Sequence, residues 1–123
     1  MRDVIFKQNL LNDVNQISWS PMNTDGRLGV NICEIFNDIS FGEHGSRLAI
    51  LNYEPGALVP KHLHTGYEMI FMLDGELFDD YGTYSKGDLV AYQPNSEHSL
   101  STRSGCTFLV LWEKPAISIQ GDA

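Results

Sequence analysis

The sequence is short of several features, and each shortage excludes a class of protein. It has only two cysteines, Cys33 and Cys106, which is too few for a disulfide framework. No apolar run approaches the roughly 18 residues needed to cross a bilayer, and the N-terminus has no signal-peptide stretch. Neither a Pro/Ser-rich linker nor an internal repeat divides the 123 residues. We therefore expect a reduced, cytoplasmic protein with a single domain and no membrane contact.

Basic residues are also scarce. Eight Lys and Arg stand against sixteen Asp and Glu, which leaves a formal net charge of −8. Binding to nucleic acid or to an anionic membrane surface needs clustered positive charge, so we expect neither as a partner. The partner that remains is a small-molecule ligand or substrate.

Turn-forming residues divide the chain into short runs rich in branched and aromatic side chains. These runs cover residues 29–36, 47–53, 67–73, 76–79, 88–92, 98–102 and 107–112. Short strands at nearly regular spacing predict an all-β sandwich or barrel. Asp74-Gly75 lies between two such runs and is a favoured hairpin turn, so we expect an antiparallel hairpin there. Glu54-Pro55-Gly56 is a further predicted turn.

The first residues show a different pattern. Phe6, Leu10, Val14 and Ile17 recur at helix-like spacing, which predicts a short helix or an irregular arm. An apolar arm on so small a domain packs either on a second subunit or on its own barrel, and the sequence leaves both open.

Histidine placement carries the strongest chemical signal. His62 and His64 are two residues apart, so in a strand both side chains point to one face. Glu68 has the same parity, provided that Thr65-Gly66 does not break the strand phase. His98 arrives from a distant strand. One histidine on a strand is ordinary, but three imidazoles and a carboxylate that converge predict a site for one divalent metal ion.

Several other side chains are candidates for a pocket beside this site. The aliphatic residues Ile70, Met72 and Leu100 share parity with the predicted ligands, so we expect them to line an adjoining pocket. His44 lies in a glycine-rich loop and is expected to be solvated. Arg47 either faces inward, where it could anchor a substrate carboxylate, or forms a surface salt bridge.

The two cysteines are expected to be buried structural residues rather than reactive thiols. The five tyrosines are expected to serve mainly in packing.

The spacing of these residues resembles the cupin superfamily. Gly56, His62, His64, Glu68 and Gly75 match every fixed position of the first cupin motif. In the second motif Gly87 and His98 are correctly spaced. However, Pro94 is one place late, Asn95 stands for the usual Gly, and Thr102 stands for the usual Asn. The Asn95 change is mild, because Asn tolerates left-handed backbone. The shift of Pro94 and the change at Thr102 concern turn detail and not ligand type, so the His98 assignment stands.

Further segments resemble the ChrR-like cupin domain, the C-terminal half of certain zinc-dependent anti-sigma factors, and related small dioxygenases that cleave β-diketones. They include residues 79–84, 94–99 and 104–106. The resemblance implies a single-domain jelly-roll β-barrel (double-stranded β-helix) over residues 17–115, with an arm at 1–16 and a tail at 116–123. It also implies a homodimer and one metal ion (Fe, Zn, Mn or Ni) held by His62, His64, Glu68 and His98.

Two functions remain open at this point. One is a metal-dependent oxygenase acting on a small ketone or enol, in which Glu68 is a ligand or a base. The other is a non-catalytic metal- or ligand-sensing module with a closed zinc site. A sugar-nucleotide epimerase fits poorly, since phosphates need basic residues. Sigma-factor binding is not expected, because the chain begins almost where the cupin begins.

Overall fold

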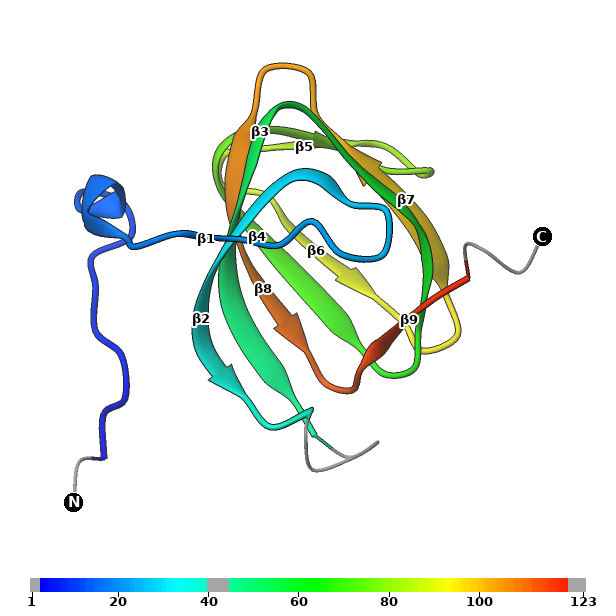
Figure 1. Ribbon diagram of the computed structural model, residues 1–123, viewed down its shortest axis with the longest axis horizontal. Coiled ribbons are helices and arrows are strands. Elements are labelled where there is room, and N and C mark those ends of the chain that lie inside the picture. The colour runs from blue at the N-terminus through cyan, green and yellow to red at the C-terminus, as the bar shows by residue number, and fades with distance from the viewer. Residues whose placement is uncertain (1–2, 40–44, 120–123) are drawn as a thin grey trace.

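The computed structural model describes residues 3–39 and 45–119 and shows a β-barrel whose strands pair antiparallel throughout (Figure 1). The strands in these ranges are β1 (Ser20–Pro21), β2 (Leu28–Asn37), β3 (Arg47–His64), β4 (Glu68–Phe78), β5 (Thr83–Ser85), β6 (Leu89–Tyr92), β7 (Glu97–Ser101), β8 (Cys106–Trp112) and β9 (Ala116–Ser118). The predicted all-β class is confirmed, and the expected divalent-metal residues fall on β3, β4 and β7.

The long strand β3 bends and takes part in two regions of the barrel wall. The first half of β3 pairs with β2 and β8, whereas its second half pairs with β7 and β9. The change of partner occurs at Glu54-Pro55-Gly56, where Gly56 has a φ of 83°. The predicted turn at this place is wrong, because the strand continues through a corner. Left-handed backbone at glycine and a proline that cannot donate to the ladder together bend the strand without ending it.

The predicted hairpin at Asp74-Gly75 is also wrong. β4 runs without interruption from Glu68 to Phe78, and its register against β8 shifts between Met72 and Asp74. Gly75 has a φ of 76°, and a Cβ there would lie 2.7 Å from the Cα of Cys106. A β-bulge therefore lies between Met72 and Asp74, just before Gly75, and the neighbouring strand approaches this glycine closely.

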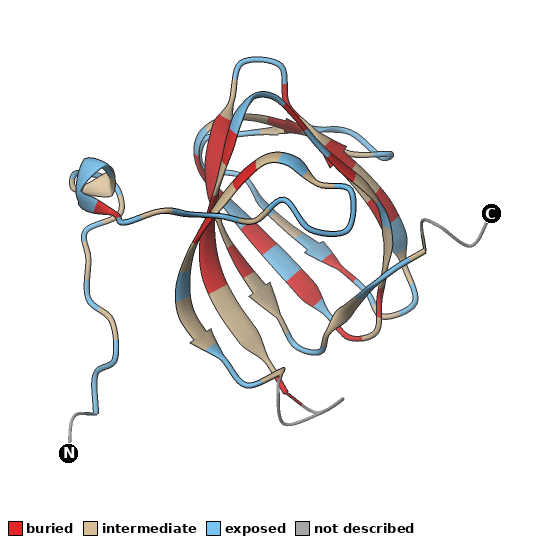
Figure 2. Ribbon diagram, viewed as in Figure 1, coloured by how far each residue is buried: buried red, intermediate tan, exposed pale blue. Residues whose placement is uncertain are grey.

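The apolar residues form two clusters. The larger fills the barrel interior and includes Leu51, Ile70, Met72, Leu100 and Phe108, all buried (Figure 2). The smaller lies outside the barrel wall and is built on three buried residues, Ile17, Ile50 and Leu73.

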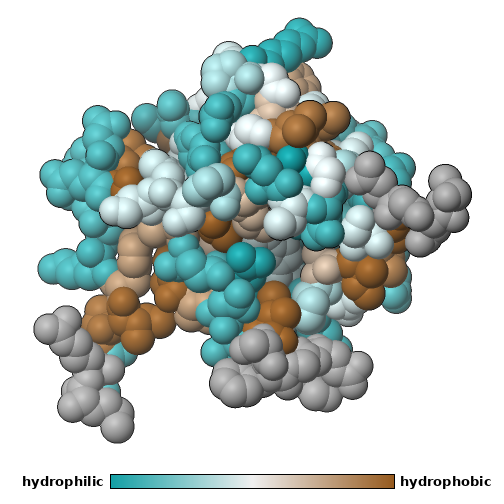
Figure 3. Space-filling model, in the orientation of Figure 1, coloured by the Kyte–Doolittle hydropathy of each residue, from teal (hydrophilic) through white to brown (hydrophobic). Residues whose placement is uncertain are grey.

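The arm supplies part of this outer cluster. Phe6, Leu10 and Val14 pack against it, so the arm covers part of its own barrel. Helical structure in the arm is limited to a 3-10 turn at Val14–Gln16. Two arm residues, Val4 and Ile5, remain 66% and 70% exposed, and hydrophobic surface gathers near this end (Figure 3). Among the described residues no helix is long and apolar enough to cross a membrane.

Candidate metal centre

Three strands bring the four predicted ligands together. His62 and His64 end β3, Glu68 begins β4, and His98 lies in β7, directly opposite His62 in the antiparallel register. Thr65-Gly66 does interrupt the strand, contrary to the condition set from the sequence. Glu68 nevertheless faces the same space, because its pairing with Trp112 of β8 and Tyr92 of β6 turns its side chain into the barrel.

The ligand atoms lie close enough to share one ion. One candidate ligand atom from each of the four residues falls within 4.8 Å of all the others. The Nε2 atoms of His64 and His98 are 3.2 Å apart. Glu68 places its Oε2 3.1 Å from His64 Nε2 and its Oε1 3.4 Å from His98 Nε2. Convergence of this kind is the geometry that a metal ion requires.

Hydrogen bonds fix the tautomers of two rings. Ser96 donates its hydroxyl hydrogen to the carbonyl oxygen of Gln93, at 2.6 Å. Toward His64 Nδ1, 2.9 Å away, the same hydroxyl can therefore only accept. His62 Nδ1 likewise faces a carbonyl, that of Pro60, at 3.2 Å. Both rings thus carry hydrogen on Nδ1, which leaves Nε2 as the free donor of an electron pair to a metal.

The charges of the cluster also call for a cation. Burial lowers the pKa of His62 to about 4, assisted by the neighbouring His98, so this ring is neutral at pH 7. Burial by itself raises the pKa of the Glu68 carboxyl. The contacts with His64 and His98 outweigh burial and bring the pKa of Glu68 to about 2. Glu68 is accordingly a buried carboxylate, and its Oε2 accepts no hydrogen bond from the described residues, which leaves this oxygen available to a cation.

A cavity of about 260 Å³ opens beside the cluster. His62 and Glu68 contribute to its wall, as do the predicted pocket residues Ile70 and Leu100. Met72, the third predicted pocket residue, is fully buried in the interior core instead. Most of the residues that line the cavity are thus apolar, and two of the four candidate metal ligands belong to its wall.

Asp79 is the site residue that the sequence reasoning missed. Its side chain is fully buried, accepts hydrogen bonds from the hydroxyls of Tyr84 and Tyr92 at 3.1 and 2.7 Å, and lies 3.9 Å from His98 Nδ1. Burial, followed by the bond to Asp79, raises the pKa of Tyr92 well above its usual range. Asp79 therefore lies behind the His98 ring, on its Nδ1 side, without a hydrogen bond to it. In the sequence, Asp79 is marked only by its position in the segment 79–84, one of the segments that resemble the ChrR-like cupin domain.

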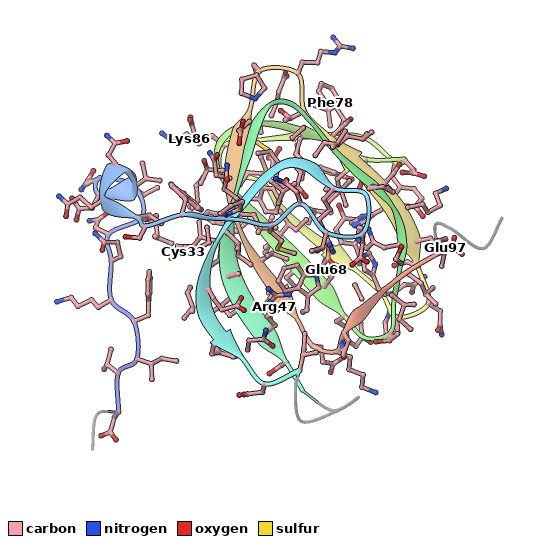
Figure 4. The ribbon with its side chains drawn as sticks, in the orientation of Figure 1. Cys33, Arg47, Glu68, Phe78, Lys86 and Glu97 are labelled. Carbon is pink, nitrogen blue, oxygen red and sulfur yellow. The ribbon has the colours of Figure 1, made fainter. Side chains whose placement is uncertain are left out.

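The structure also shows where Asn95 and the two cysteines lie. Asn95 has a φ of 70°, which is the left-handed conformation expected from the Gly-to-Asn departure. Cys106 is buried, and Cys33 is half-buried beside the arm (Figure 4). Burial raises the pKa of Cys106 to about 12, so its thiol is inert at neutral pH. His44 lies outside the described residues.

The fold and the site together define a cupin: a jelly-roll barrel with three histidines and a glutamate on its inner wall. A family model described as the ChrR cupin-like domain matches residues 7–114. The chain belongs to that family. No curated protein sequence matches it.

Solved structures share the fold at low sequence identity. An acetylacetone dioxygenase from Acinetobacter johnsonii is 15% identical with a TM-score of 0.75, over 99% of this chain and 83% of the other. A Ralstonia eutropha protein of unknown function with a cupin-like fold is 17% identical with a TM-score of 0.75, over 96% and 75%. The anti-sigma factor ChrR, in complex with SigE of Rhodobacter sphaeroides, is 22% identical with a TM-score of 0.65. This last match covers 80% of this chain but half of the ChrR structure's chain.

Proposed function

We propose that this chain binds one divalent metal ion through His62, His64, Glu68 and His98. The donor set supports this, because neutral imidazoles and one carboxylate suit Fe, Zn, Mn and Ni alike. Glu68 Oε2, which has no hydrogen-bond partner among the described residues, supports it as well. A cation would compensate the buried carboxylate of Glu68.

We further propose an oxygenase that acts on a compact ketone or enol. The observation that carries this proposal is the cavity of about 260 Å³ whose wall includes His62 and Glu68, because a purely structural site has no need of an adjoining cavity. The metal, when bound, would act as a Lewis acid and template for the enolate, and O₂ would be the oxidant.

Glu68 has one of two roles in this proposal. It is either a permanent ligand or the base that accepts the enol proton. Its low pKa favours the ionised form, which both roles need. A ligand role is the better supported, because its oxygens lie 3.1 and 3.4 Å from the ring nitrogens of two histidines.

A second candidate is a metal- or ligand-sensing module without chemistry. Four donor atoms within 4.8 Å of one another could close a tetrahedral zinc shell, and membership of the ChrR cupin-like family is in keeping with this role. The two candidates differ in whether the metal keeps a position open toward the cavity.

Oxygen consumption separates them. Protein stripped of metal and reloaded with Fe(II), Mn(II), Ni(II) or Zn(II) is supplied with 2,4-pentanedione while dissolved O₂ is followed. The oxygenase proposal expects turnover with at least one redox-active metal and incorporation of ¹⁸O from ¹⁸O₂ into the products. Absence of turnover with every metal, together with a four-coordinate zinc shell by X-ray absorption, would instead establish the sensing module.

A cavity-filling variant is the matched control. Val30 is buried, lines the cavity and lies on β2, a strand that supplies none of the four proposed ligands. Val30→Phe should keep metal binding and lose turnover, at a cost in stability of about 1–3 kcal/mol from overpacking.

A further inference from the structure

We propose that the cavity takes a ligand that carries a carboxylate, recognised by the guanidinium groups of Arg47 and Arg27. This inference deepens the proposed function, because it makes the substrate a compact oxo acid whose ketone or enol end reaches the metal. The carboxylate subsite itself needs no metal, and the test below uses that difference.

Arg47 points into the barrel rather than away from it. It is the first residue of β3 and pairs with Trp112 of β8, which in turn pairs with Glu68 of β4. Residues that are partners in register share one face of a sheet, so the three side chains form a transverse row on the inner wall. Figure 4 labels the two ends of this row, Arg47 and Glu68. With one strand between them, the backbones of Arg47 and Glu68 are roughly 10 Å apart.

The Arg47 guanidinium is hydrogen-bonded to a protein side chain through its Nε atom. Its Nε donates to Glu34 Oε2 at 2.9 Å, and its central carbon lies 5.1 Å from the ring centre of Trp112. These contacts fix the plane of the group and engage one of its three nitrogens. Arg47 also lines the cavity. Both possibilities raised from the sequence, an inward arginine and a salt bridge, are therefore true at once.

Arg27 approaches from the loop between β1 and β2. Its Nη1 is bonded within that loop, to both oxygens of Thr24 and to Asp25 Oδ2 at 3.3 Å. Arg27 lines the main cavity and, with His62, a smaller neighbouring cavity of about 30 Å³. A second guanidinium is thus placed beside the predicted metal ligands.

This combination selects a carboxylate. Beside the two arginines the wall carries Thr24, Asp25, His62 and Glu68, and its other residues are apolar or aromatic, so a ligand needs an apolar body as well as a polar end. The flat fork of a guanidinium matches the two oxygens of a carboxylate. The acidic partners Asp25 and Glu34 are themselves partly exposed, at 62% and 36% of their side chains, and satisfy each arginine only in part. Two of only eight basic residues in a chain of charge −8 thus meet at one small cavity.

The test compares two molecules of the same shape. Binding of 4-methylpentanoate and of its neutral amide, 4-methylpentanamide, is measured by titration calorimetry on the protein as purified. We expect the carboxylate to bind about tenfold or more tightly than the amide, as charge-assisted hydrogen bonds imply. Arg47→Gln and Arg27→Gln should each reduce that preference several-fold. Equal affinity for the two molecules in the unmodified protein would overturn the inference.

Arg103→Gln is the matched control. Arg103 is exposed and lies 5.2 Å from the ring centre of Phe78, so its replacement removes the same charge and a similar aromatic contact away from the cavity. The preference for the carboxylate should survive in Arg103→Gln. If Arg47→Gln proves unstable, Glu34→Gln replaces it as the test, since it leaves Arg47 in place and removes a competing acid. Equal affinity of Glu34→Gln for the two molecules would contradict the inference, because both arginines are still present in that variant.

His98→Ala separates this inference from the metal proposal. A preference that persists in His98→Ala and falls in Arg47→Gln and Arg27→Gln establishes the arginine subsite whether or not metal binds. A preference that disappears in His98→Ala and is unchanged in Arg47→Gln and Arg27→Gln shows that the carboxylate binds the metal, which overturns the inference and leaves the metal proposal standing.

Discussion

The Nε2 atoms of His64 and His98 lie 3.2 Å apart although 34 residues separate them in the chain. They meet because β3 and β7 are antiparallel neighbours, with His62 and His98 in direct register. His64 hydrogen-bonds to Ser96 and His98 lies near Asp79, so each ring is approached from behind on its Nδ1 side. The four-residue site is therefore assembled by strand pairing, and polar groups lie on the outer side of both rings.

Asp79 should control metal affinity without binding the metal. Asp79→Asn keeps the shape of the side chain but removes the charge near His98 Nδ1 and weakens the acceptor used by Tyr84 and Tyr92. We expect metal affinity to fall by about 10–100-fold, which is typical for loss of an outer carboxylate. Competition with a chelator of known affinity measures the change.

The control for this variant removes the same charge elsewhere. Asp3 is exposed in the arm, so Asp3→Asn should leave metal affinity unchanged. Equal losses in the two variants would mean that overall charge, and not the position of Asp79, sets the affinity.

Gly75 should be essential for stability. Alanine at this position would adopt a φ of 76° and place its Cβ 2.7 Å from the Cα of Cys106, in collision also with the carbonyl of Gly105. Gly75→Ala is expected to lower the free energy of unfolding by roughly 2–4 kcal/mol, measured by urea denaturation. Gly82→Ala is the comparison, because the nearest atom to a Cβ there is 3.8 Å away. Its effect should stay within about 0.5 kcal/mol.

The Asp-Gly pair shows what sequence patterns could and could not predict. The Asp-Gly pattern correctly predicted a positive φ at Gly75. It did not predict whether the chain turns back or continues as a strand after this residue. A hairpin turn and an irregular position within a continuous strand both accept that conformation, and only the pairing with β8 decides between them. Long-range pairing of this kind leaves no local mark in the sequence. The same limit applies at Gly56, where a corner in β3 resembles a turn.

The candidate site was predicted more completely than the fold details. His62 and His64 share a face because strand side chains alternate, a local rule that needs no tertiary information. Glu68 faces the site for a different reason from the one expected, since Thr65-Gly66 ends β3 and pairing with β8 and β6 orients the next strand. The role of Asp79 depends on burial, which a charged residue in a turn-like segment does not indicate.

Alkaline pH should destabilise the protein through Cys106. Burial raises the pKa of this thiol from 9.0 to about 12, so the folded state holds its proton more tightly than the unfolded state. The resulting stabilisation is complete below pH 9 and is lost progressively as the pH rises toward 12. Between pH 8 and pH 10.5 it should fall by about 2 kcal/mol. Cys106→Ala lacks this contribution, so its free energy of unfolding should fall less steeply over the same interval. Identical slopes in the two proteins would show that the thiol does not titrate in this way.

Metal stoichiometry tests the central claim most directly. Metal-stripped protein is dialysed separately against Fe(II), Mn(II), Ni(II) and Zn(II), and bound metal is measured by mass spectrometry alongside His98→Ala, with circular dichroism to confirm that the barrel is folded. The buried interior core supports a folded variant. The account predicts one ion per chain for at least one of these metals and less than about one tenth of that in His98→Ala, as expected when a ligand is removed. Equal metal content in the two folded proteins, or no metal in either, would contradict it.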